Sequence, residues 1–170
     1  MNKVSKCSLE ELIGELLREH GWRLAIAESC TGGLIGHRIT NVPGASTYYM
    51  GSIIAYAYEA KVRLLGVDWD TLEKFGAVSE STVREMAEGV RQALAADVGL
   101  SVSGIAGPGG GTPEKPIGYT WVALSTPDGT LTKQLMVKGN RLENKRDSAQ
   151  IALKFLYKYL KSLKVDLSKN

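Results

Sequence analysis

Short apolar runs alternate with helix-patterned segments over the first two-thirds of this 170-residue sequence, and this alternation constrains the fold more than any other feature. Runs rich in apolar and β-branched residues at 22–27, 47–56 and 98–105 predict strands, and the segments between them carry apolar residues at helical spacing. Two further runs, 119–125 and 131–137, flank Asp128-Gly129 and predict an antiparallel hairpin. We therefore predict an α/β fold, a three-layer sandwich in which a mixed β-sheet carries helices on both faces.

Polar residues predict where the three longest helices begin. Ser8 opens a capping box ahead of a helix that lasts until Gly21. Ser79 can cap a helix that ends near Asp97, and Asn140 can cap a last helix that reaches the 160s. Each of these helices thus has a side chain available for the unpaired N–H groups at its start.

The length and composition fit one domain over residues 1–170. With 44% hydrophobic residues the chain can bury a substantial core. No stretch approaches the roughly 20 apolar residues of a membrane span, and the acidic N-terminal helix does not resemble a signal peptide, so we expect a cytoplasmic protein without membrane association. Cys7 and Cys30 lie far apart without a Cys/His cluster, so we expect free thiols and no metal site.

The C-terminal segment carries the excess positive charge. From Lys138 onward there are 9 basic and 3 acidic residues, against 12 and 15 before it, and the chain has a net charge of +3. Lys154, Lys158 and Lys161 share one helical face, opposite an aliphatic and aromatic face. This pattern is typical of a solvated helix face. Because aromatic residues are not interleaved with the lysines on that one face, it argues against nucleic-acid binding.

The stretch 27–33 (Ala-Glu-Ser-Cys-Thr-Gly-Gly) joins the first predicted strand directly to a helix. The first N–H groups of a helix lack intrahelical partners, so this junction could hold a phosphate, a carboxylate or a developing oxyanion. Gly32 and Gly33 would let a ligand approach the backbone closely. Alternatively, Ser29 or Thr31 is simply an N-cap. The residues alone leave a ligand site and a helix cap as equal interpretations.

Few residues are available for catalysis. His37 lies two turns into a helix and His20 has no partner nearby in sequence, which disfavours a Ser/His/Asp triad, and no Walker, EF-hand or His-x-x-x-His pattern is present. A serine with a lysine remains, because a buried lysine can be neutral near pH 7 and can then accept a serine proton. Lys61, five residues after Tyr56 and among apolar neighbours, is the candidate. A surface lysine on a short helix is the simpler alternative.

Five separated motifs form a familiar set. They are 27–33, 42–46 (Val-Pro-Gly-Ala-Ser), Ala55-Tyr56 with Lys61, 76–79 (Gly-Ala-Val-Ser) and 104–116 (Gly-Ile-Ala-Gly-Pro-Gly-Gly-Gly-Thr-Pro-Glu-Lys-Pro). In this order they closely resemble the CinA C-terminal domain family, whose stand-alone members include PncC-type nicotinamide mononucleotide deamidases. The resemblance covers roughly residues 8–160.

This resemblance implies an α/β sandwich that acts as a serine amidohydrolase. The implied reaction converts nicotinamide mononucleotide to nicotinic acid mononucleotide and ammonia without a metal or cofactor, and a homodimer is the implied assembly. The positions that match the family's catalytic residues are Ser29, Ser46, Tyr56 and Lys61. The expected substrate-binding positions are Thr31, Gly32, Gly33, Ser103, Gly104, Gly107 and Arg141.

The mechanism that these residues imply begins when a serine, Ser46 or Ser29, attacks the carboxamide carbon while Lys61 takes its proton. We favour Ser46, because Ser29 is better placed to cap the helix. Backbone N–H groups of 31–33 or 103–107 would stabilise the oxyanion, and Arg141 would bind the phosphate. The alternative is a module that binds a pyridine nucleotide or another phosphorylated ligand without turnover.

Two positions depart from the family pattern. Ser103 stands where many relatives have threonine, and it keeps the hydroxyl. Gly139-Asn140-Arg141 stands where many relatives have Gly-Asp-Arg. Asparagine caps a helix about as well as aspartate, but the change removes a carboxylate beside Arg141.

Overall fold

The computed structural model describes residues 7–163 of the chain. The two ends of the predicted 1–170 domain, with Lys164 and Lys169 of the basic segment, lie outside the described residues. The elements are α1 (Leu9–His20), β1 (Leu24–Glu28), α2 (Leu34–Thr40), the 3-10 turn η1 (Ala45–Thr47), β2 (Tyr49–Ile54), α3 (Tyr58–Leu65), α4 (Trp69–Phe75), α5 (Glu80–Ala93), β3 (Val98–Gly104), β4 (Tyr119–Thr126), β5 (Gly129–Met136) and α6 (Arg141–Ser162).

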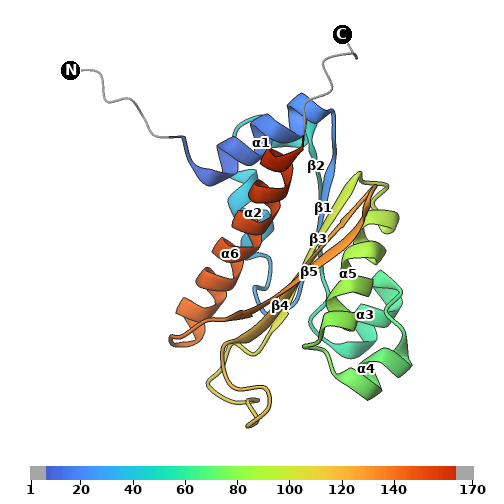
Figure 1. Ribbon diagram of the computed structural model, residues 1–170, viewed down its shortest axis with the longest axis vertical. Coiled ribbons are helices and arrows are strands. Elements are labelled where there is room, and N and C mark those ends of the chain that lie inside the picture. The colour runs from blue at the N-terminus through green and yellow to red at the C-terminus, as the bar shows by residue number, and fades with distance from the viewer. Residues whose placement is uncertain (1–6, 164–170) are drawn as a thin grey trace, which may run out of the picture.

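The described strands form one mixed five-stranded sheet in the order β2-β1-β3-β4-β5. β1 lies between β2 and β3 and runs parallel to both, whereas β4 pairs antiparallel with β3 and with β5. The carboxyl ends of β1, β2 and β3 therefore share one edge of the sheet, at the bottom of Figure 1. The predicted mixed sheet and its C-terminal hairpin are confirmed.

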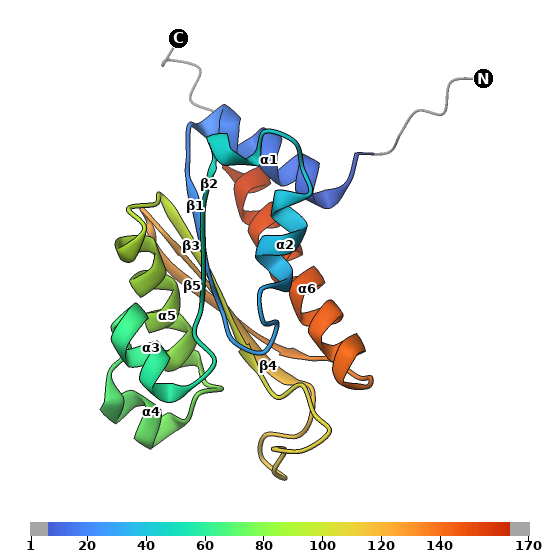
Figure 2. The ribbon, with the colours of Figure 1, turned by 180° about the vertical axis from the view of Figure 1, so that it is seen from behind.

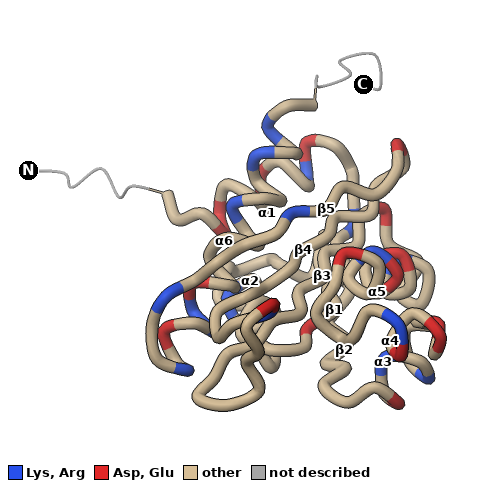
Figure 3. The backbone as a smooth tube through the Cα atoms, turned by 60° about the horizontal axis from the view of Figure 1, so that its bottom comes forward, with Lys and Arg blue, Asp and Glu red and all other residues tan. Residues whose placement is uncertain are grey.

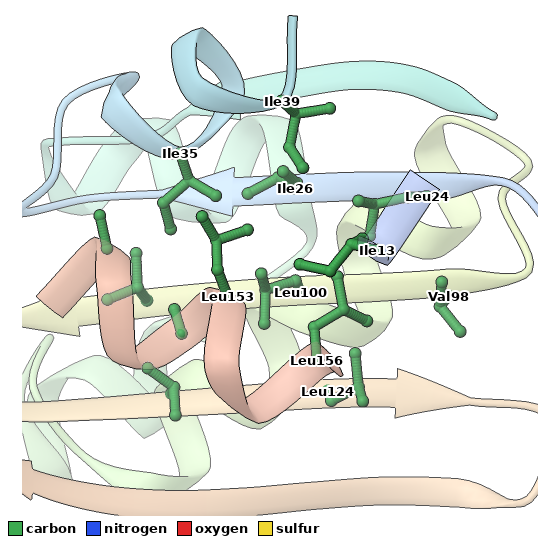
Figure 4. Close-up of a cluster of buried hydrophobic side chains, with 14 of the residues drawn as sticks. Ile13, Leu24, Ile26, Ile35, Ile39, Val98, Leu100, Leu124, Leu153 and Leu156 are labelled. Atoms are coloured by element: carbon green, nitrogen blue, oxygen red, sulfur yellow. The ribbon is translucent and has the colours of Figure 1, made fainter. Parts of the chain in front are cut away.

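Helices cover both faces of this sheet and complete the predicted three layers. Figures 1 and 2 show α1, α2 and α6 on one face and α3, α4 and α5 on the other. Successive side chains of β1 alternate between the two cores: Leu24 and Ile26 pack on the α6 side, and Ala25 and Ala27 pack on the α3 and α5 side. Figure 4 shows the first core, where side chains of α1, α2, α6, β1 and β3 meet.

The predicted helix starts are present. Ser8 forms the capping box with Glu11, and Gly21 ends α1 in the left-handed conformation with φ of 65°. The Ser79 hydroxyl accepts a hydrogen bond from a backbone N–H in the first turn of α5, and the Asn140 side chain accepts two from the first turn of α6. The caps therefore fix these starts as the sequence predicts.

α5 and β2 are shorter than predicted. α5 ends at Ala93, earlier than predicted, because Asp97 pairs with the residue that precedes β1 and so belongs to the sheet edge. The strand predicted at 47–56 is shorter, because residues Ala45–Thr47 form a 3-10 turn ahead of it. This turn takes the 42–46 motif out of the sheet.

The basic face and the cysteines are as predicted. Lys154, Lys158 and Lys161 are exposed along α6, whereas Leu156 and Leu160 on the same helix are fully buried. Both cysteines are free thiols. Among the helices of the described range, none combines the length and apolarity needed to cross a membrane.

Candidate active site

Four segments meet at the carboxyl edge of the parallel strands. Ser29 directly follows β1, Tyr56 follows β2, and Gly107 lies in the loop after β3. Hydrogen bonds connect Ser29 with Lys61 of α3, and Arg141 at the start of α6 with both Tyr56 and Gly107. Parallel strands of α/β sheets commonly bind ligands at this edge.

Lys61 and Ser29 form the centre of this arrangement. Lys61 Nζ lies 3.0 Å from Ser29 Oγ, 2.7 Å from the Ala55 carbonyl oxygen and 3.1 Å from that of Tyr56. These three acceptors match the three N–H bonds of an ammonium group. In the neutral amine, two N–H bonds still serve the carbonyls, and the lone pair faces the Ser29 hydroxyl. The same geometry therefore supports both protonation states of Lys61.

Burial tunes the proton affinity of this lysine. The Lys61 side chain is 0% exposed, so the alternative of a surface lysine is wrong. Burial lowers the pKa of the Lys61 amine to about 8, because desolvation disfavours the ammonium form, and the charge of the Cys30 thiolate acts in the opposite direction. With this pKa, about a tenth of the Lys61 population is neutral at pH 7.

Cys30, the neighbour of Ser29, is a poor nucleophile. Its side chain is buried, and burial raises the pKa of the thiol to about 12. The reactive form of cysteine is the thiolate, which is scarce at neutral pH with such a pKa. The hydroxyl beside Lys61 is thus the better nucleophile of this turn.

Within one chain, Ser46 lies far in space from Ser29 and Lys61. It is an exposed residue of η1, directly before β2. Because Leu24 pairs with Tyr49, η1 lies at the amino end of β1, whereas Ser29 follows its carboxyl end. The two serines are therefore separated by about 16 Å along the strand direction. Our preference for Ser46 as the nucleophile disagrees with this geometry, and Ser29 takes its place.

The Glu28 side chain, at the end of β1, caps the start of α2. The sequence analysis gave this residue no role. Its carboxylate is fully buried and accepts hydrogen bonds of 2.7 to 3.1 Å from three backbone N–H groups at the start of α2 and from the Thr31 hydroxyl. A negative charge at this position also balances the helix dipole. The expectation that these helical N–H groups bind an anionic ligand is therefore wrong, and the Thr31 hydroxyl supports Glu28.

The two glycines of the turn are needed for its backbone conformation. Gly32 and Gly33 have φ of 63° and 96°, values that other residues rarely adopt. Their N–H groups donate to a carbonyl of the turn and to Glu28. In the described part of the chain, the N–H groups of Cys30 and Thr31 donate to no acceptor in another residue. These two groups are the candidate oxyanion donors of the turn.

Arg141 joins α6 to the rim of the site. Its Nη1 donates to the Gly107 carbonyl oxygen at 2.6 Å and its Nη2 donates to the Tyr56 hydroxyl at 3.0 Å. Asn144, which lies buried one turn further along α6, donates to the Ala106 carbonyl oxygen. Arg141, the expected phosphate ligand, thus already holds two protein acceptors. Nothing in the sequence distinguished Asn144 from other polar residues of the helix.

Ser103 is the β3 neighbour of Ser29. The Ser29 N–H donates to the Val102 carbonyl oxygen, so Ser103 occupies the matching position on the adjacent strand, where it is buried. At Gly104, a Cβ atom would collide with the Thr120 side chain. The Gly104 position therefore serves the close packing of β3 on β4.

The 76–79 motif anchors the long loop after β3. Lys115, within this loop, donates from Nζ to the carbonyl oxygens of Phe75 and Val78 at 2.6 and 2.9 Å. The loop is therefore held at both sides of the site, by Arg141 near its start and by the α4–α5 junction near its end. Within residues 7–163 no group of three or more His, Cys, Asp or Glu side chains could hold a metal ion.

Comparison with known proteins identifies the family. The sequence profile described as CinA C-terminal domain matches residues 6–160. The chain belongs to the CinA C-terminal domain family. A putative competence-damage inducible protein of Halothermothrix orenii is 54% identical over 155 residues, which are 91% of this chain and 38% of that protein. A CinA-like protein of Kosmotoga olearia is 48% identical over 157 residues, which are 92% and 38% of the two chains.

The chain thus spans less than two-fifths of the length of these curated CinA relatives. Solved CinA structures match it nearly completely. The competence/damage inducible protein CihA from Agrobacterium tumefaciens has a TM-score of 0.84 and 34% identity, and the match covers 95% of this chain and all of that one. A competence or damage-inducible protein from Enterobacter asburiae has a TM-score of 0.86 and 33% identity, covering 91% and 99%. The fold described above is the CinA fold.

Proposed function

We propose that this CinA domain is a serine amidohydrolase that hydrolyses the carboxamide of nicotinamide mononucleotide, with Ser29 as nucleophile and Lys61 as general base. One observation carries the proposal: the buried Lys61 amine lies 3.0 Å from Ser29 Oγ, and its other two neighbours are carbonyl oxygens that can only accept. A neutral Lys61 therefore has its lone pair available for the Ser29 proton. The substrate and the reaction follow from the family resemblance of the motifs.

In the first half of the reaction, Ser29 Oγ attacks the carboxamide carbon and Lys61 takes the hydroxyl proton. The N–H groups of Cys30 and Thr31 donate to the oxyanion of the tetrahedral intermediate. Lys61 then passes its proton to the amide nitrogen, the C–N bond breaks, and ammonia leaves. Ser29 now carries the nicotinoyl group as an ester.

In the second half, water attacks the ester carbon and Lys61 takes a proton from the water. The bond between the carbonyl carbon and Ser29 Oγ breaks, and Oγ regains the proton from Lys61. Nicotinic acid mononucleotide leaves, so one water is consumed for each ammonia released. Tyr56, whose hydroxyl is held by Arg141 and whose ring is exposed at the rim, offers an aromatic surface to the pyridine ring.

Ammonia release from nicotinamide mononucleotide tests this proposal. We expect the purified protein to release ammonia, and Ser29→Ala to lose about three orders of magnitude or more in kcat. Ser46→Ala is the matched control, because it removes the other serine, and it should remain within about threefold of the wild type. The reverse ranking of the two variants would contradict the assignment of the nucleophile.

The same assay separates the enzyme from a binding module. If the protein bound nicotinamide mononucleotide, measured by calorimetry, but released no ammonia above the Ser29→Ala background, the domain would be a pyridine-nucleotide binding module. In that case we would expect a partner protein that responds to the nucleotide-bound form of the domain.

A further inference from the structure

A pocket of about 560 Å³ lies between the start of α2 and the start of α6. Residues 31–34 and His37 form one wall of this α2–α6 pocket, and Asn140, Leu142, Lys145 and Arg146 form the other. Figures 1 and 2 both show α2 and α6 side by side on the same face of the sheet. The pocket therefore begins at the turn that carries Ser29 and extends away from Lys61, toward the α6 side.

The polar lining of the pocket is cationic. No Asp or Glu side chain lines it, and in residues 7–163 neither Lys145 nor Arg146 has an ion pair or a hydrogen bond from its side chain. Figure 3 shows that Lys and Arg residues recur along α6, which supplies this wall. Two unpaired cations that face one cavity favour an anionic ligand.

The backbone at the two helix starts is already used. The carboxylate of Glu28 accepts from the first N–H groups of α2, and the side chain of Asn140 accepts from those of α6. Because the Thr31 N–H is assigned to the oxyanion, a second anion in the pocket relies on side chains, chiefly those of Lys145 and Arg146. Leu34 and Leu142 add apolar surface to the two walls.

Lys145 lies close to the nucleophile turn. It follows Arg141 by one helical turn and therefore shares its face of α6. A Cβ atom at Gly32, three residues after Ser29, would lie 3.5 Å from Lys145 Nζ. A ligand with a reactive carboxamide at one end and an anionic group at the other can thus span from Ser29 to Lys145.

We propose that the α2–α6 pocket is the subsite for the phosphate of the substrate, with Lys145 as its principal ligand and Arg146 as the second. The identity of the substrate rests on the function proposed above. Lys145 therefore replaces Arg141 as the expected phosphate ligand, because the guanidinium of Arg141 holds Tyr56 and Gly107. Charge-assisted contacts of this kind are stronger than neutral ones.

The test compares nicotinamide mononucleotide with nicotinamide riboside, which lacks only the phosphate. For Lys145→Ala we expect the KM for the mononucleotide to rise about 10- to 100-fold with kcat nearly unchanged, the loss that removal of one charged contact produces. The constants for the riboside should stay within about twofold. Lys158→Ala, on the exposed face of the same helix, is the control because it removes the same charge, and it should leave KM and kcat for both substrates unchanged.

Two outcomes would overturn the subsite: an unchanged KM for the mononucleotide in Lys145→Ala, or an equal loss with the riboside. Binding of the mononucleotide to Ser29→Ala, measured by calorimetry, separates the two proposals. If the wild type released no ammonia but Ser29→Ala bound the mononucleotide more tightly than the Ser29→Ala/Lys145→Ala double variant, the proposed reaction would fail and the subsite would stand. If the wild type released ammonia but Ser29→Ala and the Ser29→Ala/Lys145→Ala double variant bound the mononucleotide with equal affinity, the proposed reaction would stand and only the subsite would fail.

Discussion

Lys61 is the residue on which the proposed reaction depends most. Its amine is fully buried, and its contacts are one hydroxyl and two carbonyl oxygens, with no carboxylate among them. A carboxylate partner would raise the pKa of the amine and hold the proton on it. Without one, desolvation dominates, and the pKa falls to about 8. A small rise in pH therefore changes the fraction of Lys61 that can act as a base.

The pH dependence of activity follows from this pKa. In the proposed mechanism Lys61 acts only in its neutral form, so kcat should rise with pH from 6, reach half of its maximum near the pKa of about 8 and level off above about pH 9. Lys61→Arg should lose at least about three orders of magnitude in kcat, because arginine stays protonated in proteins. Steady-state kinetics between pH 6 and 9.5 measure both effects.

Lys74→Arg, on α4, provides a matched control for the size and charge of the substitution and should retain the wild-type pH profile. A Lys61→Arg variant with near-native kcat would show that a fixed positive charge suffices, and the role of general base would then be wrong. Circular dichroism on each variant checks that the fold is retained.

At the residue scale, the sequence singled out Lys61 as the proposed base but left Ser29 and Ser46 as alternative partners. Lys61 stood out because its neighbours are apolar, and the structure confirms that it is buried. The choice between Ser29 and Ser46 depended on which end of β1 each serine reaches, and this follows from the register of β1 with β2. Lys145 gave no signal, because an unpaired lysine looks like any other in a sequence.

The turn between β1 and α2 is the element that holds Ser29, the proposed nucleophile, in place. α2 has only seven residues, and Gly33 at its N-cap position has no side chain for the first N–H groups. The Glu28 carboxylate, which lies in the sheet layer, accepts hydrogen bonds from three of these N–H groups and from the Thr31 hydroxyl instead. Ser29 directly follows Glu28, so the cap also fixes the residue that faces Lys61.

Glu28→Gln tests this cap. An amide has one acceptor oxygen and no charge, and its NH₂ group would face N–H donors, so we expect the free energy of unfolding to fall by about 2 to 4 kcal/mol. The urea midpoint at a constant m-value measures the loss. Glu11→Gln, in the exposed capping box of α1, should change stability by less than about 0.5 kcal/mol, since glutamine also fits that box. Equal effects of the two changes would contradict the buried cap.

Elements were predicted well where local signals decide them. The caps at Ser8, Ser79 and Asn140 involve residues close in sequence and appear in the structure. The hairpin signalled by Asp128-Gly129 is also present, but its turn residues are Pro127 and Asp128, and Gly129 already begins β5. Glu28 belongs to β1 but caps α2, and the burial of its carboxylate depends on the packing of α2 against the sheet. Such long-range roles leave no local pattern.

At the scale of the whole molecule, the sheet separates two helical layers, and the candidate site draws on both. Lys61 comes from the α3 side, whereas Arg141 and Lys145 come from α6 on the other side. The alternation of strands and helices was sufficient to predict the layers. The strand order that places β1 between β2 and β3 could not be predicted, because nothing in the local sequence fixes which strands become neighbours.

The buried Lys61 also makes the stability of the whole domain depend on pH. Its pKa is about 8 in the folded state, below the ordinary 10.5 of the unfolded chain. Between these values the unfolded state holds a proton that the folded state has lost, so the Lys61 contribution to the free energy of unfolding rises with pH. From pH 7 to 9.5 we expect a gain of about 2 kcal/mol from this residue. Burial raises the pKa values of Tyr48, Tyr49 and Tyr159, so their contributions fall above about pH 10, beyond this window.

Urea unfolding of the wild type and of Lys61→Met across this range isolates the effect. Methionine fills a similar volume without a titratable group, so the difference in unfolding free energy between the two proteins should shift toward the wild type by about 2 kcal/mol as the pH rises from 7 to 9.5. The other titrating groups are shared by the two proteins and cancel in the difference, apart from Cys30, whose thiol interacts electrostatically with Lys61. A difference that stays constant with pH would mean that Lys61 keeps its proton throughout, and both the lowered pKa and the general-base role would be wrong.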